Sequence, residues 1–277
     1  MFADAALAAR IDRAEAGFSA AVAGAVRDRG GADALVREIG GGLAAFARPG
    51  SPMNKLIGVG FAGALDDGEL AAIEDAWRRR GEPVRVELST LADPDVATAL
   101  CARGYRLIGF ENVLGRAVAD AALAPPPPGV VVAAADDAAA ERRWGEMAVD
   151  GFAHPDGTGA GAEAFARDVI AEVIADLHGA RGVHRYLASI DGVAAGAATM
   201  RLDGGLAQLA GAATRPALRG RGVQAALLHH RLGVARRAGC DLAVVTTAPG
   251  SRSQRNVQRS GFALLYARAV LVSSSTR

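Results

Sequence analysis

The sequence predicts an α/β (α+β) protein of two domains. Its 277 residues, 51% of them hydrophobic, suffice for two cores of ordinary size. Four consecutive prolines, Pro125 to Pro128, interrupt the chain near its middle and favour an extended linker over a helix or central strand. On both sides of them, apolar residues recur with the periods of strands and helices. We therefore place domains at residues 1–123 and 129–277, joined by a linker at 124–128.

The second domain has the predicted order β-α-α-β-β-β-α-β-α-β-β. Asp191-Gly192 and Asp203-Gly204-Gly205 are typical of tight hairpin turns, and Gly239 and Gly261 are typical of helix ends. The predicted strands are 130–135, 184–190, 193–202, 206–214, 242–247, 262–266 and 268–272, and the predicted helices are 138–149, 162–178, 223–238 and 252–259.

Part of this pattern recurs before the prolines. Residues 84–108 align with 241–265 without a gap, which pairs Gly104 with Gly261. Upstream, 40–45 resembles the hairpin turn at 191–195, and a helix is predicted at 67–80. Two interpretations stay open: a duplicated domain, or two alanine-rich segments that are alike in composition only.

Composition excludes several classes of function. The net charge is +1, so nothing in the whole chain favours nucleic acid or an anionic membrane. The two cysteines, Cys101 and Cys240, make no disulfide framework and are interpreted as small core residues. The sequence shows neither a signal-peptide pattern nor an apolar run of spanning length. A cytoplasmic protein is expected, and a homodimer is left open.

The segment RPALRGRGVQAALL, residues 215–228, carries the strongest functional signal. A glycine-rich loop that enters a helix offers unpaired N–H groups and the positive end of the helix dipole to an anion. Gly220 and Gly222 permit close approach, and Arg219 and Arg221 are predicted to bind phosphate oxygens. Residues 215–259 hold nine arginines, no lysine and a single acid, Asp241, although a solvated basic face is the alternative.

Residues 220–225 also fit the dinucleotide pattern GxGxxG/A, a weak signal on its own. In a dinucleotide fold the glycines follow the first strand directly, and an acidic residue closes the next strand. Here the preceding strand ends near Thr214, and the next closes on Val244-Val-Thr-Thr247. This context disfavours a nicotinamide or flavin site.

With these elements around it, the loop resembles the GNAT superfamily of acyl-CoA-dependent N-acyltransferases. Residues 219–224 match all but the last position of the signature Q/R-x-x-G-x-G/A, where Gln224 replaces a small residue. The resemblance covers about 129–273 and extends more faintly to 1–120. It implies two GNAT-like domains, each a mixed, largely antiparallel sheet flanked by helices, with the first a degenerate copy.

The resemblance also implies where acetyl-CoA binds as cosubstrate. Backbone N–H groups of Gly220, Arg221, Gly222, Val223, Gln224 and Ala225 hold its pyrophosphate, and Ala212, Ala213 and Thr214 pair with the pantetheine arm like an added strand. A main-chain N–H there stabilises the oxyanion, without a covalent enzyme intermediate. Asn256 is a further candidate for the cofactor.

The usual proton-transfer residues of the family are missing. Gln208 stands where many members have a glutamate base, and Val257 stands where many have a tyrosine acid. Tyr266 is interpreted as a core residue. The loop residues Asp150, His154 and Asp156 border the expected acceptor pocket, although a solvated histidine is the simpler interpretation. The catalytic residues are therefore left unassigned.

No metal site is expected, because His229 and His230 lack ligand spacing with the cysteines. In the first domain, Asp66, Asp67 and Glu69 occupy the equivalent of the phosphate loop and would repel a phosphate, so that domain is expected to lack cofactor.

The predicted function is transfer of an acetyl group from acetyl-CoA to a primary amine of a small molecule or peptide, by direct attack. A non-catalytic acyl-CoA-binding or regulatory module is the alternative. The sequence identifies neither the acceptor nor the acyl length.

Overall fold

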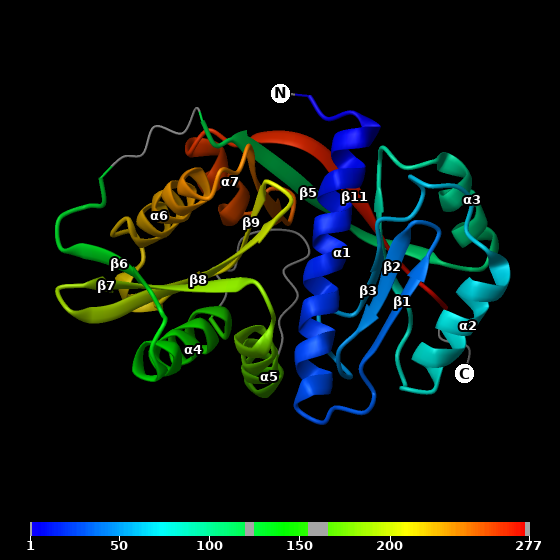
Figure 1. Ribbon diagram of the computed structural model, residues 1–277, viewed down its shortest axis with the longest axis horizontal. Helices are drawn as coiled ribbons and strands as arrows, with labels where there is room; N and C mark the ends of the chain where they lie inside the picture. Colours follow the sequence, from blue (N-terminus) through cyan, green and yellow to red (C-terminus); the bar gives the residue numbers. More distant parts are fainter. Residues whose placement is uncertain (1, 120–124, 155–165, 275–277) are drawn as a thin grey trace. The chain divides into compact units, whose positions relative to one another are not determined.

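The computed structural model describes residues 2–119, 125–154 and 166–274. Two compact units divide the chain: the first holds residues up to 113, 179–181 and 264 onward, and the second holds 114–178 and 182–263. The C-terminal strand therefore belongs to the first unit, although the segment before it lies in the second (Figure 1). We describe each unit by itself.

The first unit is a sheet with helices on its two faces. Its order is β1-β2-β3-β4-β11-β5, in which β3 and β4 are parallel and the pairs β1–β2, β2–β3 and β4–β11 are antiparallel. Its elements are α1 (Ala5–Asp28), β1 (Leu35–Ile39), β2 (Gly42–Phe46), β3 (Lys55–Ile57), α2 (Asp67–Arg78), β4 (Arg85–Ser89), α3 (Pro94–Ala102), β5 (Arg106–Ala117) and β11 (Ala263–Val272).

Successive side chains of β4 point to opposite faces of this sheet. Val86 and Leu88 join the apolar core with Trp77 of α2 and Leu100 of α3. Glu87, between them, points to the face that α1 covers, where its side chain is 1% exposed. One face of the first unit is thus apolar, and the other is charged and buried.

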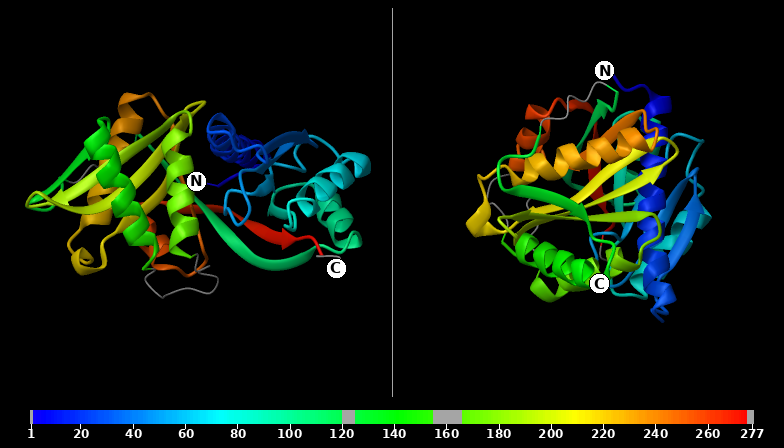
Figure 2. Two further views of the ribbon diagram at one scale, coloured as in Figure 1. Left: turned by 90° about the horizontal axis from the view of Figure 1, so that it is seen from below. Right: turned by 60° about the vertical axis from the view of Figure 1, so that its left-hand side comes forward.

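The second unit has the strand order β5-β10-β9-β8-β7-β6, with β5 shared between the units. Helices α4 and α6 pack against this sheet and lie on its two sides in Figures 1 and 2. Its further elements are β6 (Val130–Ala134), α4 (Ala138–Phe152), α5 (Arg167–Gly179), β7 (Val183–Ile190), β8 (Val193–Asp203), β9 (Leu206–Thr214), the 3-10 turn Pro216–Leu218, α6 (Val223–Arg237), β10 (Leu242–Thr247) and α7 (Arg252–Arg259).

Most predicted elements are confirmed to within a few residues. The two predicted strands 262–266 and 268–272 are one continuous strand, β11, because no turn residue separates them. The helix predicted from residue 162 begins at Arg167, and 162–165 lie outside the described residues. In the described part of the chain, no helix combines the length and apolarity that a membrane span requires.

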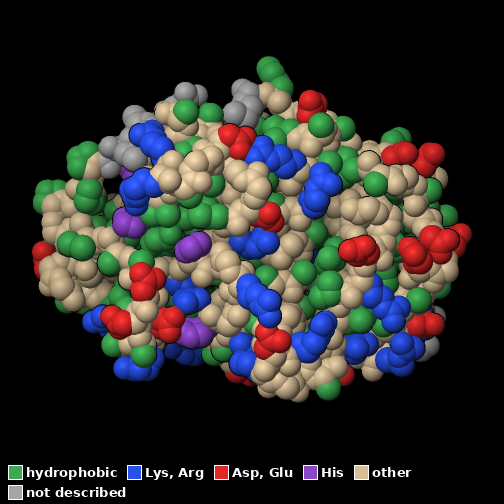
Figure 3. Space-filling model, in the orientation of Figure 1, with side chains coloured by type: hydrophobic (Ala, Val, Ile, Leu, Met, Phe, Trp, Pro, Cys, Tyr) green, Lys and Arg blue, Asp and Glu red, His purple; other side chains and the backbone are tan. Residues whose placement is uncertain are grey.

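Helix capping follows the acidic residues that precede most helices. Asp4, Asp66, Asp93 and Asp137 each accept a hydrogen bond from an N–H of the first turn of their helix. Charged side chains of both signs are interspersed over the face drawn in Figure 3.

A buried ion pair joins β11 to α1 within the first unit. Arg268 donates to Asp12 Oδ1 from Nη2 at 2.6 Å and from Nε at 3.0 Å, and Tyr266 donates its hydroxyl to the same oxygen at 2.6 Å. Both charged side chains are 1% exposed. Because loss of one partner would leave a buried uncompensated charge, costing about 3–5 kcal/mol, the pair anchors the C-terminal strand. The core interpretation of Tyr266 is thereby confirmed.

Three further side chains extend this ion pair into a charge cluster of Asp12, Lys55, Glu87, Glu111 and Arg268. Lys55 Nζ lies 2.8 Å from Glu87 Oε1, and Arg268 Nη1 lies 3.6 Å from Glu87 Oε2 and 3.9 Å from Glu111 Oε2. Burial, reinforced by the negative charge of Glu87, raises the pKa of Glu111 to about 7.

The Glu111→Gln variant tests the cost of this ionisation. Between about pH 4.5 and 7 the folded protein binds more protons at Glu111 than the unfolded chain does, so its contribution to stability falls as pH rises through this window. Relative to the parent protein, Glu111→Gln should gain on the order of 2 kcal/mol of unfolding free energy between pH 5 and pH 8, measured by urea denaturation. The exposed Glu38→Gln is the control, and an equal pH response in both variants would contradict the assignment.

Candidate functional site

The site is built where β9 and β10 end. These parallel strands pair only at their first residues, Leu206 with Leu242, Ala207 with Ala243 and Gln208 with Val244. Strand β9 continues to Thr214 and β10 to Thr247, so each extends beyond the paired region. A strand edge that has lost its neighbour offers main-chain groups to an extended ligand.

Two hydroxyl groups at the strand ends support a polar ligand. Thr214 and Thr247 are 7% and 5% exposed, and in the described part of the chain their Oγ1 atoms have no hydrogen-bond partner. A buried hydroxyl without a partner costs about 1–3 kcal/mol, and such groups in native structures need an explanation. A bound molecule with amide and carbonyl groups would supply the missing partners.

The loop after β9 enters α6 without a side-chain cap. Gly222 is the N-cap residue with φ of +79°, and the first turn contains no acidic residue. The first intrahelical bond runs from Ala226 N to Gly222 O, which leaves the N–H groups of Val223, Gln224 and Ala225 without helical acceptors. This is an uncapped, electropositive helix end, as an anion site requires.

The two glycines of the loop meet different requirements. Gly220 has φ of +79° and open space where a Cβ would stand. Gly222 has the same φ, but a Cβ there would lie 2.5 Å from Pro127 Cγ. Gly220 therefore keeps the loop open, whereas Gly222 also makes room for the proline-rich segment. No sequence pattern predicts this second role.

The arginines of the loop have partners of their own. Arg219 donates from Nε to Thr214 O at 3.3 Å and from Nη2 to the carbonyl of His154, which ties the loop to the end of β9 and to the segment after α4. Arg221 is half-exposed and lies 3.8 Å from Asp191. Phosphate binding by Arg219 and Arg221 stays a prediction.

The end of α4 lies against the same end of β9. A Cβ on Gly151 would lie 2.5 Å from Ala213 Cβ, so only glycine permits this approach. The neighbouring Asp150 lies 3.7 Å from Arg215 and 3.9 Å from Arg167. The ring Nδ1 of His154 is 2.8 Å from Asp150 O. Asp150 and His154 thus border the candidate site, whereas Asp156 lies outside the described residues.

The positions where the family pattern is broken have structural partners. Gln208 is buried, and its Oε1 accepts a hydrogen bond from Arg201 Nη1 at 3.1 Å. Val257 packs in the apolar core of the second unit. Asn256 Oδ1 accepts from Arg259 Nη2 at 2.8 Å. Neither Gln208 nor Val257 can transfer a proton. Gln208 is held by its hydrogen bond to Arg201, and Val257 is held by apolar packing.

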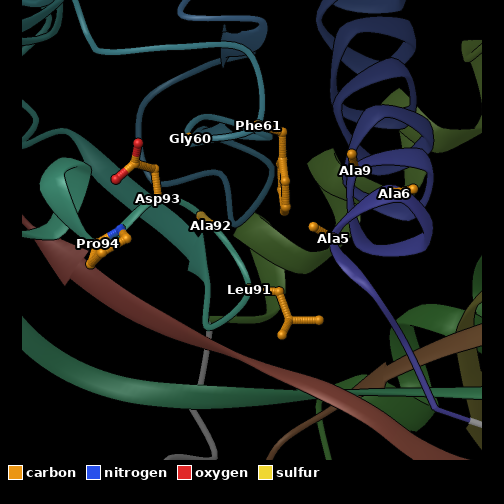
Figure 4. Close-up of a pocket in the computed structure, with 9 residues that line it drawn as sticks. All are labelled: Ala5, Ala6, Ala9, Gly60, Phe61, Leu91, Ala92, Asp93 and Pro94. Carbon is orange, nitrogen blue, oxygen red and sulfur yellow. The ribbon is translucent and has the colours of Figure 1, made fainter.

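The first unit has a pocket beyond the ends of its parallel strands, and the start of α2 carries acidic side chains. The pocket, about 620 Å³, lies beyond β3 and β4 and is lined by Ala5, Ala6, Ala9, Gly60, Phe61, Leu91, Ala92, Asp93 and Pro94 (Figure 4). At the start of α2, the Asp66 carboxylate accepts from Glu69 N at 2.8 Å, and Asp67 and Glu69 add negative charge. An anion would be repelled there.

Fold and site together define an α/β unit in which two parallel strands part beside an uncapped helix N-terminus. The model of the acetyltransferase (GNAT) family matches residues 153–262, so this part of the chain is similar to a GNAT acetyltransferase domain. This family transfers acyl groups from acyl-CoA to amines, and it generally uses acetyl-CoA. No curated protein matches the chain.

Solved structures resemble the chain over most of its length. A GCN5-related N-acetyltransferase from Kribbella flavida is 19% identical with a TM-score of 0.68, covering 97% of this chain and 96% of that one. A tandem GNAT protein from the clavulanic acid biosynthesis pathway is 14% identical with a TM-score of 0.58, covering 89% and 85%. A GCN5-related N-acetyltransferase from Sphaerobacter thermophilus is 18% identical with a TM-score of 0.51, covering 73% and 65%. At these identities the likeness shows the fold, and the predicted fold class is confirmed.

Substitution of Gly220 tests the anion site. Because the space beside Gly220 is open, Gly220→Glu should add a negative charge without a clash and weaken CoA binding on the order of 100-fold by calorimetry. Gly239→Glu is the matched control: Gly239 has φ of +73° and open space, but follows the other end of α6. Unchanged affinity in Gly220→Glu, or equal loss in both variants, would remove the helix end from the site.

Proposed function

We propose that the second unit is an N-acetyltransferase that moves an acetyl group from acetyl-CoA to a primary amine of a small molecule or peptide. The observation that carries the proposal is the parting of β9 from β10 directly before an uncapped helix N-terminus. A single extended ligand with an apolar arm and a pyrophosphate matches both features. The cytoplasm, where acyl-CoA is available, is the proposed location.

Each part of the site has a proposed role. The N–H groups of residues 220–225 bind the pyrophosphate, and residues 212–214 pair with the pantetheine arm as an added strand. The hydroxyls of Thr214 and Thr247 take hydrogen bonds from the arm, which accounts for their missing partners. Asn256, which lies on α7, is proposed as a further contact of the cofactor.

The reaction proposed is direct transfer. The amine nitrogen bonds to the thioester carbonyl carbon, the carbon–sulfur bond breaks, and CoA leaves with its thiol. Main-chain N–H groups of β9 stabilise the negative charge that develops on the carbonyl oxygen. The amine must lose one proton, and Asp150 is the described carboxylate that borders the end of β9.

A second candidate function rests on Gln208 and Val257. Because neither residue can exchange a proton, the unit could bind acyl-CoA without turnover and act as a regulatory module. The two functions share the anion site, and they differ only in whether an amine is acetylated.

We further propose that residues 1–123 form a degenerate GNAT-like copy, with the sequence boundary at 124–128. Both units place a parallel strand pair at the corresponding position, β3–β4 and β9–β10. Gly104 and Gly261 end helices α3 and α7 with φ of +84° and +83°, each followed by a residue whose N–H bonds back to the carbonyl five positions earlier. Because Asp66 occupies the helix end in the first unit, one CoA per chain is expected.

Turnover separates the two candidate functions. With acetyl-CoA and a panel of amino acids, peptides, aminosugars and polyamines, we expect release of free thiol above hydrolysis for at least one class of amine. The Gly220→Glu variant serves as the control, because its binding of acetyl-CoA is expected to be weakened. Tight binding of CoA with no thiol release for any amine would favour the regulatory module. Titration that gives two CoA per chain would contradict the degenerate first unit.

A further inference from the structure

Strand β9 is irregular just before the residues proposed to bind the pantetheine arm. Along β8 and β9, Thr199 pairs with Ala210, but Ala197 pairs with Ala213. Two residues of β9, Gly211 and Ala212, therefore stand opposite the single residue Ala198. This two-against-one arrangement is a β-bulge, a feature that redirects a strand and is common beside active sites.

The bulge depends on glycine. Gly211 has φ of +55°, a left-handed conformation that other residues rarely adopt. A Cβ at this position would lie 2.9 Å from Thr199 Oγ1, which is itself buried without a partner in the described part of the chain. The irregular backbone is thus specified by the sequence at one position.

A buried arginine holds the bulge from the α6 side. Arg231 is 3% exposed, and its Nη1 donates to Thr199 O at 2.8 Å and to Ala210 O at 3.2 Å. Its Nε donates to Leu227 O, in the preceding turn of α6, at 3.1 Å. One guanidinium therefore joins the helix to both strands at the pair of residues that precedes the bulge.

A tryptophan holds the same point from α4. Trp144 is 1% exposed, and its Nε1 donates to Ala198 O at 3.2 Å. Ala198 is the residue that the bulge leaves opposite two partners. Side chains from two different helices thus bond the main-chain carbonyls around one irregularity.

We propose that Trp144 and Arg231 are positioning residues for acyl transfer, which clamp the bulge of β9 so that the main chain of Ala212–Thr214 meets the thioester in the reactive geometry. This inference rests on the proposed function for the role of residues 212–214. The clamp needs no contact with the acyl group, because it acts through the carbonyls of Ala198, Thr199 and Ala210.

The chemistry of the clamp explains why these two side chains suit the position. A guanidinium carries several donors in a rigid plane, so it bridges two carbonyls and a helix turn at once. Burial lowers the pKa of Arg231 to about 10, and the side chain remains protonated at neutral pH. A lysine keeps the charge but not the planar fork, and a phenylalanine keeps the ring of Trp144 but not its donor.

Three variants test the clamp: Trp144→Phe, Arg231→Lys and Arg231→Met. Trp144→Phe and Arg231→Met each have a matched control elsewhere in the chain. Trp77→Phe removes an equally buried indole whose Nε1 has no partner in the described part of the chain, and Arg237→Met removes an exposed arginine from the same helix. The first measurement is amide hydrogen exchange of the peptide that spans residues 206–214.

We expect amide hydrogen exchange in this peptide to be faster in the clamp variants than in the parent protein. In the control variants the exchange rate should be unchanged. On an accepted amine, kcat should fall on the order of 100-fold, the loss typical of misplaced reacting groups, while Kd for CoA changes less than about threefold. The Trp144→Phe/Arg231→Met double variant should lose less than the product of the single losses.

Other results would overturn the proposal. Normal kcat per folded molecule in both Trp144→Phe and Arg231→Lys would show that the two residues serve stability alone. Unchanged exchange in residues 206–214 would show that the bulge does not need them. If no amine is acetylated by the parent protein, the exchange measurement still decides whether the clamp exists, so its failure is separate from failure of the proposed function. Should Arg231→Met not fold, the other two variants carry the test.

Discussion

The short pairing of β9 with β10 is the constraint on which the candidate site depends. Three residue pairs hold the parallel strands together, and beyond Gln208 and Val244 the pairing ends. The strand ends then carry buried hydroxyls, at Thr214 and Thr247, without partners in the described part of the chain. Residues 209–214 of β9 lie beyond the paired region. This short segment contains the bulge, the contact with Gly151 of α4 and the carbonyl that Arg219 bonds. The local irregularities of the second unit are therefore concentrated where an extended ligand would lie.

The two units show how helix capping decides what a strand end can bind. In the first unit the carboxylate of Asp66 satisfies the start of α2 and adds charge that an anion cannot approach. In the second, Gly222 supplies no side chain, and the N–H groups of α6 stay open. A pocket of similar location exists in the first unit, but it lacks this positive end. One side chain per helix thus separates a helix start that could accept an anion from one that repels it.

Most helices and strands could be predicted from the sequence, because the residues that begin and end them are local in the chain. Glycine-terminated helices, aspartate-glycine turns and the glycine-rich entry to α6 depend on nearby residues, and the elements they define were found at nearly the predicted places. Strands 262–266 and 268–272 were predicted as separate because periodicity cannot show that a strand continues through a change of face pattern. The partner of β11 could not be predicted either, because its pairing with β4 joins residues about 180 positions apart.

Only the part of the candidate site that is contiguous in the sequence could be predicted. The residues of the phosphate loop are contiguous, whereas the clamp joins α4, β8, β9 and α6, whose contacts no local pattern reveals. No sequence pattern marks Trp144 or Arg231 as a contact of a strand. The bulge left a weak signal, Gly211 inside a strand pattern, which is typical of such irregularities. Pro127 packing on Gly222 gave no signal at all.

A buried arginine lies in each unit, and the two differ in the groups that stabilise their charge. Arg268 in the first unit is neutralised by Asp12, and this pairing raises its pKa above the ordinary value. Arg231 in the second unit bonds carbonyl oxygens, and burial lowers its pKa to about 10. Carbonyl dipoles solvate a cation without cancelling its charge, so positive potential persists around the bulge of β9. A strand that must stabilise negative charge on a thioester oxygen gains from that potential, whereas an ion pair such as Arg268–Asp12 would leave little of it. Under the proposed function, the chemistry therefore belongs to the second unit, whereas the ion pair of the first unit anchors β11.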